Sequence, residues 1–281
     1  MGTTTCSNLE ILLPGKRRPH RVVVLCTDDV MTRHTCATLL RAGVNLVGVV
    51  NCARMGRARV AFLLRWTRRH GLWRTAGQIL GRAYDRAMNA RQDLKLLQTM
   101  VDDVADREAI RRAGIPTVHT DSYSRPATIE AIRRLDPDIF VVHAKCMVGP
   151  KVRALAPVAV IGGHPGITPH YRGAYSPFWA LSHGRPEMVG FTIFLLDNGI
   201  DTGPVLVQGT VPINRGEDSH LTLAWKGMLR QCELQGEVIG RLDAGEGVPF
   251  RRIVQIPERS EFGPPTLRDV LWYRRVQQVV R

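Results

Sequence analysis

A histidine and an aspartate, His164 and Asp201, are the residues of this chain best placed to do chemistry. His164 follows the apolar run VAVIGG and precedes a proline, so its imidazole should lie where a buried strand ends. Asp201 lies in the turn DNGIDTG between two strand-like segments, 189–197 and 204–213. Open α/β sheets bind ligands at the carboxyl ends of their strands. An imidazole and a carboxylate at that edge could move a proton between two reacting groups.

The stretch HPGITPHYRGAYSPFWAL, followed by DNGIDTGPVL, resembles the paired motifs of the formyltransferase family. That family includes methionyl-tRNA, glycinamide ribonucleotide and sugar N-formyltransferases, and the resemblance is clear over 136–213. It implies a Rossmann-like sheet and transfer of a formyl group from 10-formyltetrahydrofolate to an amine. It also implies an Asn, a His and an Asp at the active centre. His164 and Asp201 match the last two, whereas Gly162 stands where the family has its asparagine.

The glycine matters because formyl transfer passes through a tetrahedral species with a developing oxyanion. An asparagine amide would donate to that oxyanion, and loss of one such donor typically costs about 100- to 1000-fold in rate. Gly162 offers only its backbone N–H. Three readings follow: His143 or Lys145, at the end of the preceding strand, supplies the donor instead; the acyl donor is not a formyl folate; or the chain no longer catalyses and acts as a binding protein or partner subunit. Hydrolysis, with water in place of the amine, is a separate alternative.

The resemblance implies further contacts on both sides of the reacting centre, and it implies no metal. The residues expected to contact the folate are Ala144, Lys145, Cys146, Met147, Asp197, Gly199, Ile200 and Thr202. Those expected to contact the amine substrate are His143, Tyr171, Arg172 and Gly173. From turn chemistry alone, Asp197 is expected to build the loop that carries Asp201.

The alternation of strand-like and helical segments predicts an α/β fold with a Rossmann-like, mostly parallel sheet and helices on both faces. We expect a helix after the first strand, with Thr27 as its N-cap, and a short helix beginning with Ser176 as its cap. The expected organisation is a polar N-terminal segment (1–20), a catalytic domain (21–215) interrupted by a basic helical insert (54–107), and a C-terminal helical appendage (216–281).

The chain carries a formal net charge of +14, which favours acidic partners. Much of the charge lies in 54–96, where arginines interleave with apolar residues and only Asp85 and Asp93 oppose them. This pattern is typical of amphipathic helices on an anionic membrane or glycolipid surface, of nucleic-acid binding, or of an insert that packs on the domain or makes an oligomer contact.

The segment after 215 leaves little room for a tRNA-binding domain, so we expect no tRNA partner and a small amine acceptor, an amino sugar or an amino acid. The 6 cysteines show no metal-ligand spacing and no disulfide framework. No run is apolar and long enough to span a bilayer. These features favour the cytoplasm, with peripheral membrane attachment as an alternative.

Overall fold

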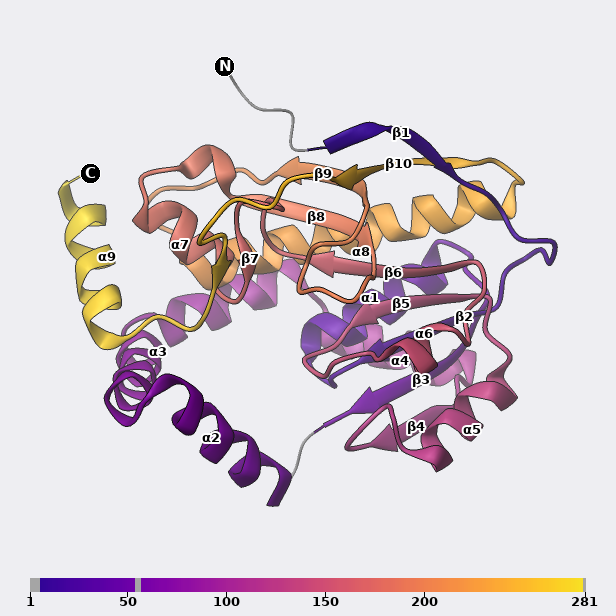
Figure 1. The fold of residues 1–281 in the computed structure, drawn as a ribbon, viewed down its shortest axis with the longest axis horizontal. Helices are drawn as coiled ribbons and strands as arrows, with labels where there is room; N and C mark the ends of the chain where they lie inside the picture. The colour runs from indigo at the N-terminus through magenta and orange to yellow at the C-terminus, as the bar shows by residue number, and fades with distance from the viewer. Residues whose placement is uncertain (1–5, 54–56, 280–281) are drawn as a thin grey trace.

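The computed structural model describes residues 6–53 and 57–279; Arg54, counted above in the basic segment, lies outside them. A nine-stranded sheet, in the order β1-β10-β9-β8-β6-β5-β2-β3-β4, runs through the molecule (Figure 1). Its strands are β1 (Cys6–Leu12), β2 (Val22–Cys26), β3 (Leu46–Cys52), β4 (Thr117–Thr120), β5 (Ile139–His143), β6 (Ala159–His164), β8 (Gly190–Leu195), β9 (Val205–Thr210) and β10 (Val248–Ile253). A small second sheet pairs β7 (Arg172–Gly173) with β11 (Glu261–Phe262).

The sheet is parallel from β4 through β6 and antiparallel from β6 to the opposite edge. The parallel strands are short and rich in valine and isoleucine, and β2 is buried along its whole length, as expected for strands covered on both faces. Because the strands from β4 through β6 in the sheet order run parallel, the loops that follow them emerge at the same edge of the sheet. The predicted α/β class, with helices on both faces, is confirmed.

Helices pack on both faces of the sheet (Figure 1). They are α1 (Val30–Arg41), α2 (Arg57–His70), α3 (Leu72–Met100), α4 (Asp103–Ala113), α5 (Pro126–Leu135), α6 (Pro150–Arg153), α7 (Ser176–Ser182), α8 (His220–Asp243) and α9 (Leu267–Val279). Leu39 of α1 and Ile239 of α8 are fully buried against one face of the sheet. Ile132 of α5 and Val152 of α6 are fully buried against the other.

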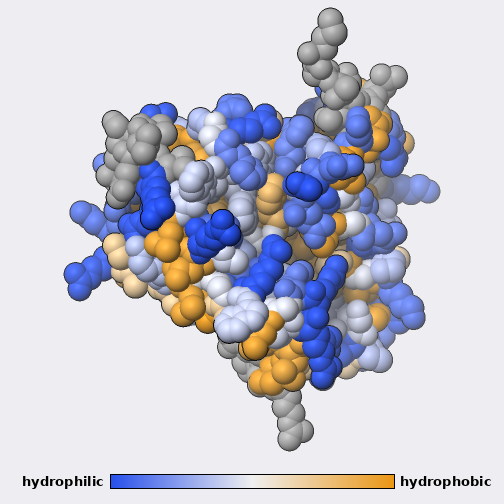
Figure 2. Space-filling view, turned by 60° about the vertical axis from the view of Figure 1, so that its left-hand side comes forward, coloured by the Kyte–Doolittle hydropathy of each residue, from blue (hydrophilic) through white to orange (hydrophobic). Residues whose placement is uncertain are grey.

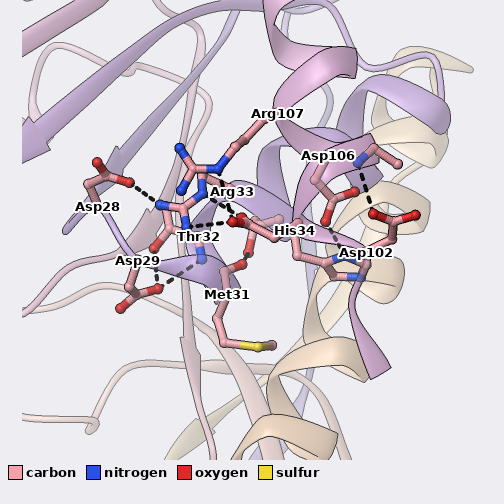
Figure 3. A network of polar contacts seen from close by, with 12 residues as sticks. Asp28, Asp29, Met31, Thr32, Arg33, His34, Asp102, Asp106 and Arg107 are labelled. Atoms are coloured by element: carbon pink, nitrogen blue, oxygen red, sulfur yellow. Dashed lines mark hydrogen bonds and ion pairs between the residues drawn. The ribbon is translucent and has the colours of Figure 1, made fainter. Parts of the chain in front are cut away.

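The first helix, α1, begins two residues later than the sequence suggested. Its N-cap is Asp29, not Thr27, because the Asp29 carboxylate accepts from the backbone N–H of Thr32 at 3.0 Å. Charged side chains then join α1 to α4 (Figure 3). Nε of Arg33 donates to Oδ1 of Asp103 at 2.7 Å. Nδ1 of His34 lies 2.8 Å from Oδ2 of the buried Asp106. These contacts fix the loop after β2, which borders the functional edge.

The two ends of the chain are more integrated than the sequence predicted. Within the segment expected to be a polar extension, β1 forms an edge strand antiparallel to β10. The region after 215 is not only helical, because β10 joins the main sheet, β11 pairs with β7, and α9 packs on α3.

The basic segment forms α2 and most of α3, and α3 packs against α8 and α9. Several apolar side chains of these helices remain exposed, including Trp73 at 89% and Leu64 at 54%. Figure 2 shows such hydrophobic side chains in small groups between hydrophilic ones. No helix in 6–53 or 57–279 is long and apolar enough to cross a membrane.

Candidate active site

A cavity of about 940 Å³ opens at the carboxyl ends of β5 and β6. Its floor contains Gly162, Gly163 and His164, and the loop after β8 brings Asp201 to the same space. Side chains of α3 and α8 form its opposite walls. The two residues singled out by motif, far apart in sequence, therefore meet in one cavity.

His164 lies between three partners. Its Nδ1 is 3.3 Å from Oδ2 of Asp201. Its Nε2 is 2.7 Å from the backbone carbonyl oxygen of Tyr171 and 2.9 Å from the hydroxyl of Ser176. The imidazole is only 5% exposed, so its orientation is fixed by these contacts.

The nature of those partners decides which protons the ring carries. A backbone carbonyl only accepts, so the 2.7 Å contact with Tyr171 requires a hydrogen on Nε2. Nδ1, on the other side of the ring, then faces Oδ2 of Asp201 at 3.3 Å.

Asp201 is held in place by unusual backbone conformation. It has φ of +51°, in the left-handed region, where aspartate is one of the few tolerated residues with a side chain. Its Oδ2 accepts from the backbone N–H of Gly173 at 2.8 Å. Arg172 donates to the carbonyl oxygen of Ile200 at 2.8 Å, which ties the 171–174 loop to the turn. Both loops therefore position the His164 and Asp201 pair together.

The space beside Gly162 is filled by apolar side chains. A Cβ atom at this position would lie 2.4 Å from Cδ1 of Leu196 and 3.1 Å from Cζ of Phe194. These residues lie on β8 and just after it, and Phe194 is the cross-strand partner of Gly162. An asparagine does not fit here unless Leu196 moves, so the glycine and the leucine form a matched pair.

Gly166 is required by close packing under the imidazole. A Cβ there would lie 2.5 Å from Cβ of Ser176 and 2.6 Å from Nε2 of His164. We expect Gly166→Ala to lower the free energy of unfolding by about 1–3 kcal/mol, measured by urea denaturation. The matched control is Gly240→Ala on α8, where nothing lies within 4 Å of the added atom. That change should stabilise the chain by about 0.5–1 kcal/mol; equal effects at both positions would contradict the packing argument.

The comparisons with known proteins agree with this arrangement. The family model described as formyl transferase matches residues 75–231, more than half of the chain. The chain belongs to the formyl transferase family. The match extends on both sides of the 136–213 motif region, into α3 and α8. Members of the family are transferases of one-carbon groups, so the predicted enzyme class is confirmed at this level.

Relatives and solved structures support the same family. The chain is 36% identical over 147 residues to a methionyl-tRNA formyltransferase of Trichlorobacter lovleyi, covering 51% of this chain and 45% of the relative. It resembles the crystal structure of glycinamide ribonucleotide transformylase 1 from Symbiobacterium toebii, with a TM-score of 0.54 and 18% identity over 80% of this chain and 88% of that one. A 4-N formyltransferase from Francisella tularensis matches with a TM-score of 0.53 and 16% identity over 92% and 88%. At these identities the structures show the shared fold alone.

The expectation that tRNA is not a partner is contradicted by these relatives. The curated proteins matched are methionyl-tRNA formyltransferases, including one from Synechococcus that is 35% identical over 153 residues, 54% of this chain and 46% of the relative. The expectation rested on the short segment after 215. Because the chain spans less than half the length of these relatives, that length says nothing about the acceptor.

The residues that the family resemblance assigned to the folate mostly line the cavity. Those that do are Ala144, Lys145, Cys146, Met147, Asp197, Gly199 and Ile200. Thr202 does not line the cavity. Its hydroxyl donates to the carboxylate of Asp197 at 2.8 Å. Asp197 also accepts from the backbone N–H of Gly199 at 2.9 Å, which makes it the builder of this turn.

Two residues expected to bind the amine lie behind the wall instead. Tyr171 and Arg172 are 3% and 8% exposed and do not line the cavity. Tyr171 contributes its backbone carbonyl to His164, while Arg172 bonds Ser260 and Ile200. Their role is to support the loop, whereas Gly173 and His143 do line the cavity.

The two side chains considered as substitutes for the missing asparagine already have partners. His143 Nε2 is 2.8 Å from Oε1 of Gln235, and Lys145 donates to Asp29 at 3.3 Å while its side chain remains 76% exposed. Among the described residues, no group of three His, Cys, Asp or Glu side chains could hold a metal ion.

The buried histidines make stability depend on pH. Burial lowers the pKa of His143 and His220 from the ordinary 6.5, although Gln235 opposes the shift at His143, and Asp85 and Asp93 oppose it at His220. Below pH 6.5 the unfolded chain takes up protons that the folded chain resists, so stability is full above that value and falls as pH falls below it. We expect the urea midpoint to drop between pH 7.5 and pH 5.5, and His143→Gln to reduce the drop. An unchanged drop in this variant would exclude a contribution from His143.

Sequence reasoning missed Ser176 and the polar residues of the α3 wall. Ser176 was read as a helix cap, but Tyr175, with φ of +62°, precedes the helix, and the serine hydroxyl contacts His164 instead. No sequence signal separates these two roles. The cavity lining, which includes Asp85 and Asp93, is the observation that joins α3 to the site.

Proposed function

We propose that the chain transfers a formyl group from 10-formyltetrahydrofolate to the amine of a small molecule, with His164 and Asp201 as the catalytic pair. The observation that carries the proposal is the contact of these two side chains, 3.3 Å apart, in a cavity lined by the two loops that the family resemblance assigns to the folate. That cavity has room for two reactants, and Met147, Val148 and Leu196 give it an apolar side.

The pair divides the work of formyl transfer. The amine nitrogen forms a bond to the formyl carbon and passes a proton to Asp201. The bond from that carbon to the donor nitrogen then breaks, and the donor nitrogen takes the proton from Asp201. During this exchange the formyl oxygen carries negative charge, and Nδ1 of His164 lies where an N–H on it can donate to that oxygen. Ser176 and the carbonyl of Tyr171 hold the ring in that orientation.

A second acceptor is supported by a separate observation. The curated relatives are named methionyl-tRNA formyltransferases, which favours the amine of an aminoacylated tRNA. The chemistry at His164 and Asp201 is the same for both acceptors, so only a direct comparison of substrates separates them.

The first test is calorimetric titration with 5-formyltetrahydrofolate, a stable analogue of the donor. Binding in the micromolar range is expected, and absence of binding near 1 mM, about −4 kcal/mol, would contradict the folate-dependent reading. Amino sugars, diamino acids and methionyl-tRNA are then supplied with 10-formyltetrahydrofolate, and the formylated product is identified by mass spectrometry. Release of formate at an equal rate without any amine would instead identify a hydrolase.

A further inference from the structure

The part of the cavity wall formed by α3 and the start of α8 carries charged groups that the formyl-transfer chemistry does not use. Four of them, Arg82, Asp85, Arg86 and Asp93, come from α3, and His220 comes from the first position of α8. Spacings of three, four and seven residues put the α3 members on one face of that helix. All five line the same cavity as His164.

Two members of this wall, Asp93 and His220, are buried and incompletely bonded, whereas Asp85 is half-buried and accepts from Asn89 at 2.8 Å. Asp93 is 6% exposed, and its Oδ1 has no hydrogen-bond partner; His220 is 4% exposed, and its Nδ1 has none. Asp85 Oδ2 lies 3.6 Å from Nε2 of His220. Burial raises the pKa of Asp93 despite a hydrogen bond from Ser219.

These carboxylates lack the cations that normally accompany buried acids. Within 6–53 and 57–279, neither Asp85 nor Asp93 pairs with a lysine or an arginine, although the chain has a net charge of +14. Leaving a buried polar atom without a hydrogen bond lowers the stability of the folded chain. A ligand group that donates hydrogen bonds and carries positive charge would remove this cost.

The basic part of the wall is also unpaired. Arg82 and Arg86 have no hydrogen bond or ion pair with another residue that the structure describes, and their spacing puts them one turn apart. A guanidinium group matches a carboxylate in shape and charge. The wall therefore presents sites for both signs of charge on a single helix face.

We propose that this wall binds the zwitterionic head of a diamino acid, with its ammonium group at Asp93, Asp85 and His220 and its carboxylate at Arg82 and Arg86. The second amine of the same molecule then extends across the cavity to His164 and Asp201. This assignment rests on the proposed formyl transfer and names its acceptor. A simple diamine lacks the carboxylate, and a simple amino acid with a single terminal amine lacks the ammonium.

The test compares L-ornithine and L-lysine with putrescine and 5-aminopentanoate, by calorimetry on the full chain without a formyl donor. We expect the better diamino acid to bind at least about 10-fold more tightly than either analogue, because each analogue loses one charged contact. Asp93→Asn should weaken the diamino acid about 10-fold or more but leave 5-aminopentanoate unchanged. Arg86→Gln should weaken the diamino acid and leave putrescine unchanged.

Two control measurements separate loss of ligand contacts from general effects of charge and stability. Lys95→Gln, which removes a charge from α3 outside the cavity lining, should leave all four affinities unchanged. Asp93→Asn should not lower the melting temperature, because it removes a buried charge whose Oδ1 has no hydrogen-bond partner; a clear drop would indicate a structural role and overturn the assignment. Equal affinities for all four compounds, or no binding of any, would overturn it as well. Titration with 5-formyltetrahydrofolate reports on formyl transfer separately, so failure of one proposal is not mistaken for failure of the other.

Discussion

Replacing His164 by asparagine is expected to lower kcat for formyl transfer about 100- to 1000-fold, the range seen for removal of one oxyanion donor. The substitution removes the group that faces the carboxylate of Asp201 at 3.3 Å and leaves the turn around that aspartate supported by Gly173. The loss should therefore fall on kcat, and KM for the donor should change little. The rate is followed by release of tetrahydrofolate with the acceptor found in the substrate comparison.

The matched control for this change is His183→Asn. His183 is a second histidine near the same loop, 3.3 Å from the hydroxyl of Tyr171, but it does not line the cavity. This variant should keep kcat within about threefold of the original, since it lies outside the reacting centre. Equal losses in the two variants would show that the loop, rather than the imidazole of His164, is what matters.

The double variant with Gly162→Asn and Leu196→Ala is expected to raise kcat by about 100-fold. The asparagine restores a side-chain donor to the oxyanion. Gly162→Asn alone should not reach this value. Its Cβ would lie 2.4 Å from Cδ1 of Leu196, and such overpacking typically costs about 1–3 kcal/mol of stability. Leu196→Ala opens the space that the asparagine needs, so the double variant should recover part of that stability.

Kinetics and urea denaturation of both single variants and the double variant test this coupling. Leu196→Ala alone should lose stability without gaining activity. A double variant that is folded, binds 5-formyltetrahydrofolate and remains no faster than the original chain would show that the donor is supplied elsewhere in the cavity.

The local parts of the site could be predicted from sequence, because local signals encode them. The glycines and proline around His164 end its strand, and the turn chemistry of DNGIDTG places Asp201 between β8 and β9. The helical character of the segment after 216 was also readable, and α8 occupies its first part, from His220 to Asp243.

The remaining parts depend on contacts between distant segments, which periodicity does not encode. Pairing of β1 with β10 joins residues more than 200 positions apart, and nothing in either segment specifies the partner. The filling of the space at Gly162 by Leu196 depends on strand register. The orientation of α3, which brings Asp93 into the cavity, depends on its packing against α8 and α9.

The pairing of β11 with β7 has a consequence for how the chain is made. Backbone groups of Ser260 and Phe262 bond the loop that carries the His164 partner Tyr171, and Arg172 reaches Ser260 as well. During synthesis, the sheet from β2 to β9 can form while the last residues are still inside the ribosome. The hydrogen bonds that Ser260 and Phe262 make to the catalytic loop cannot form at that stage. Newly made chains should therefore acquire their fold before their catalytic competence, which appears only when residues 260–262 have emerged and docked.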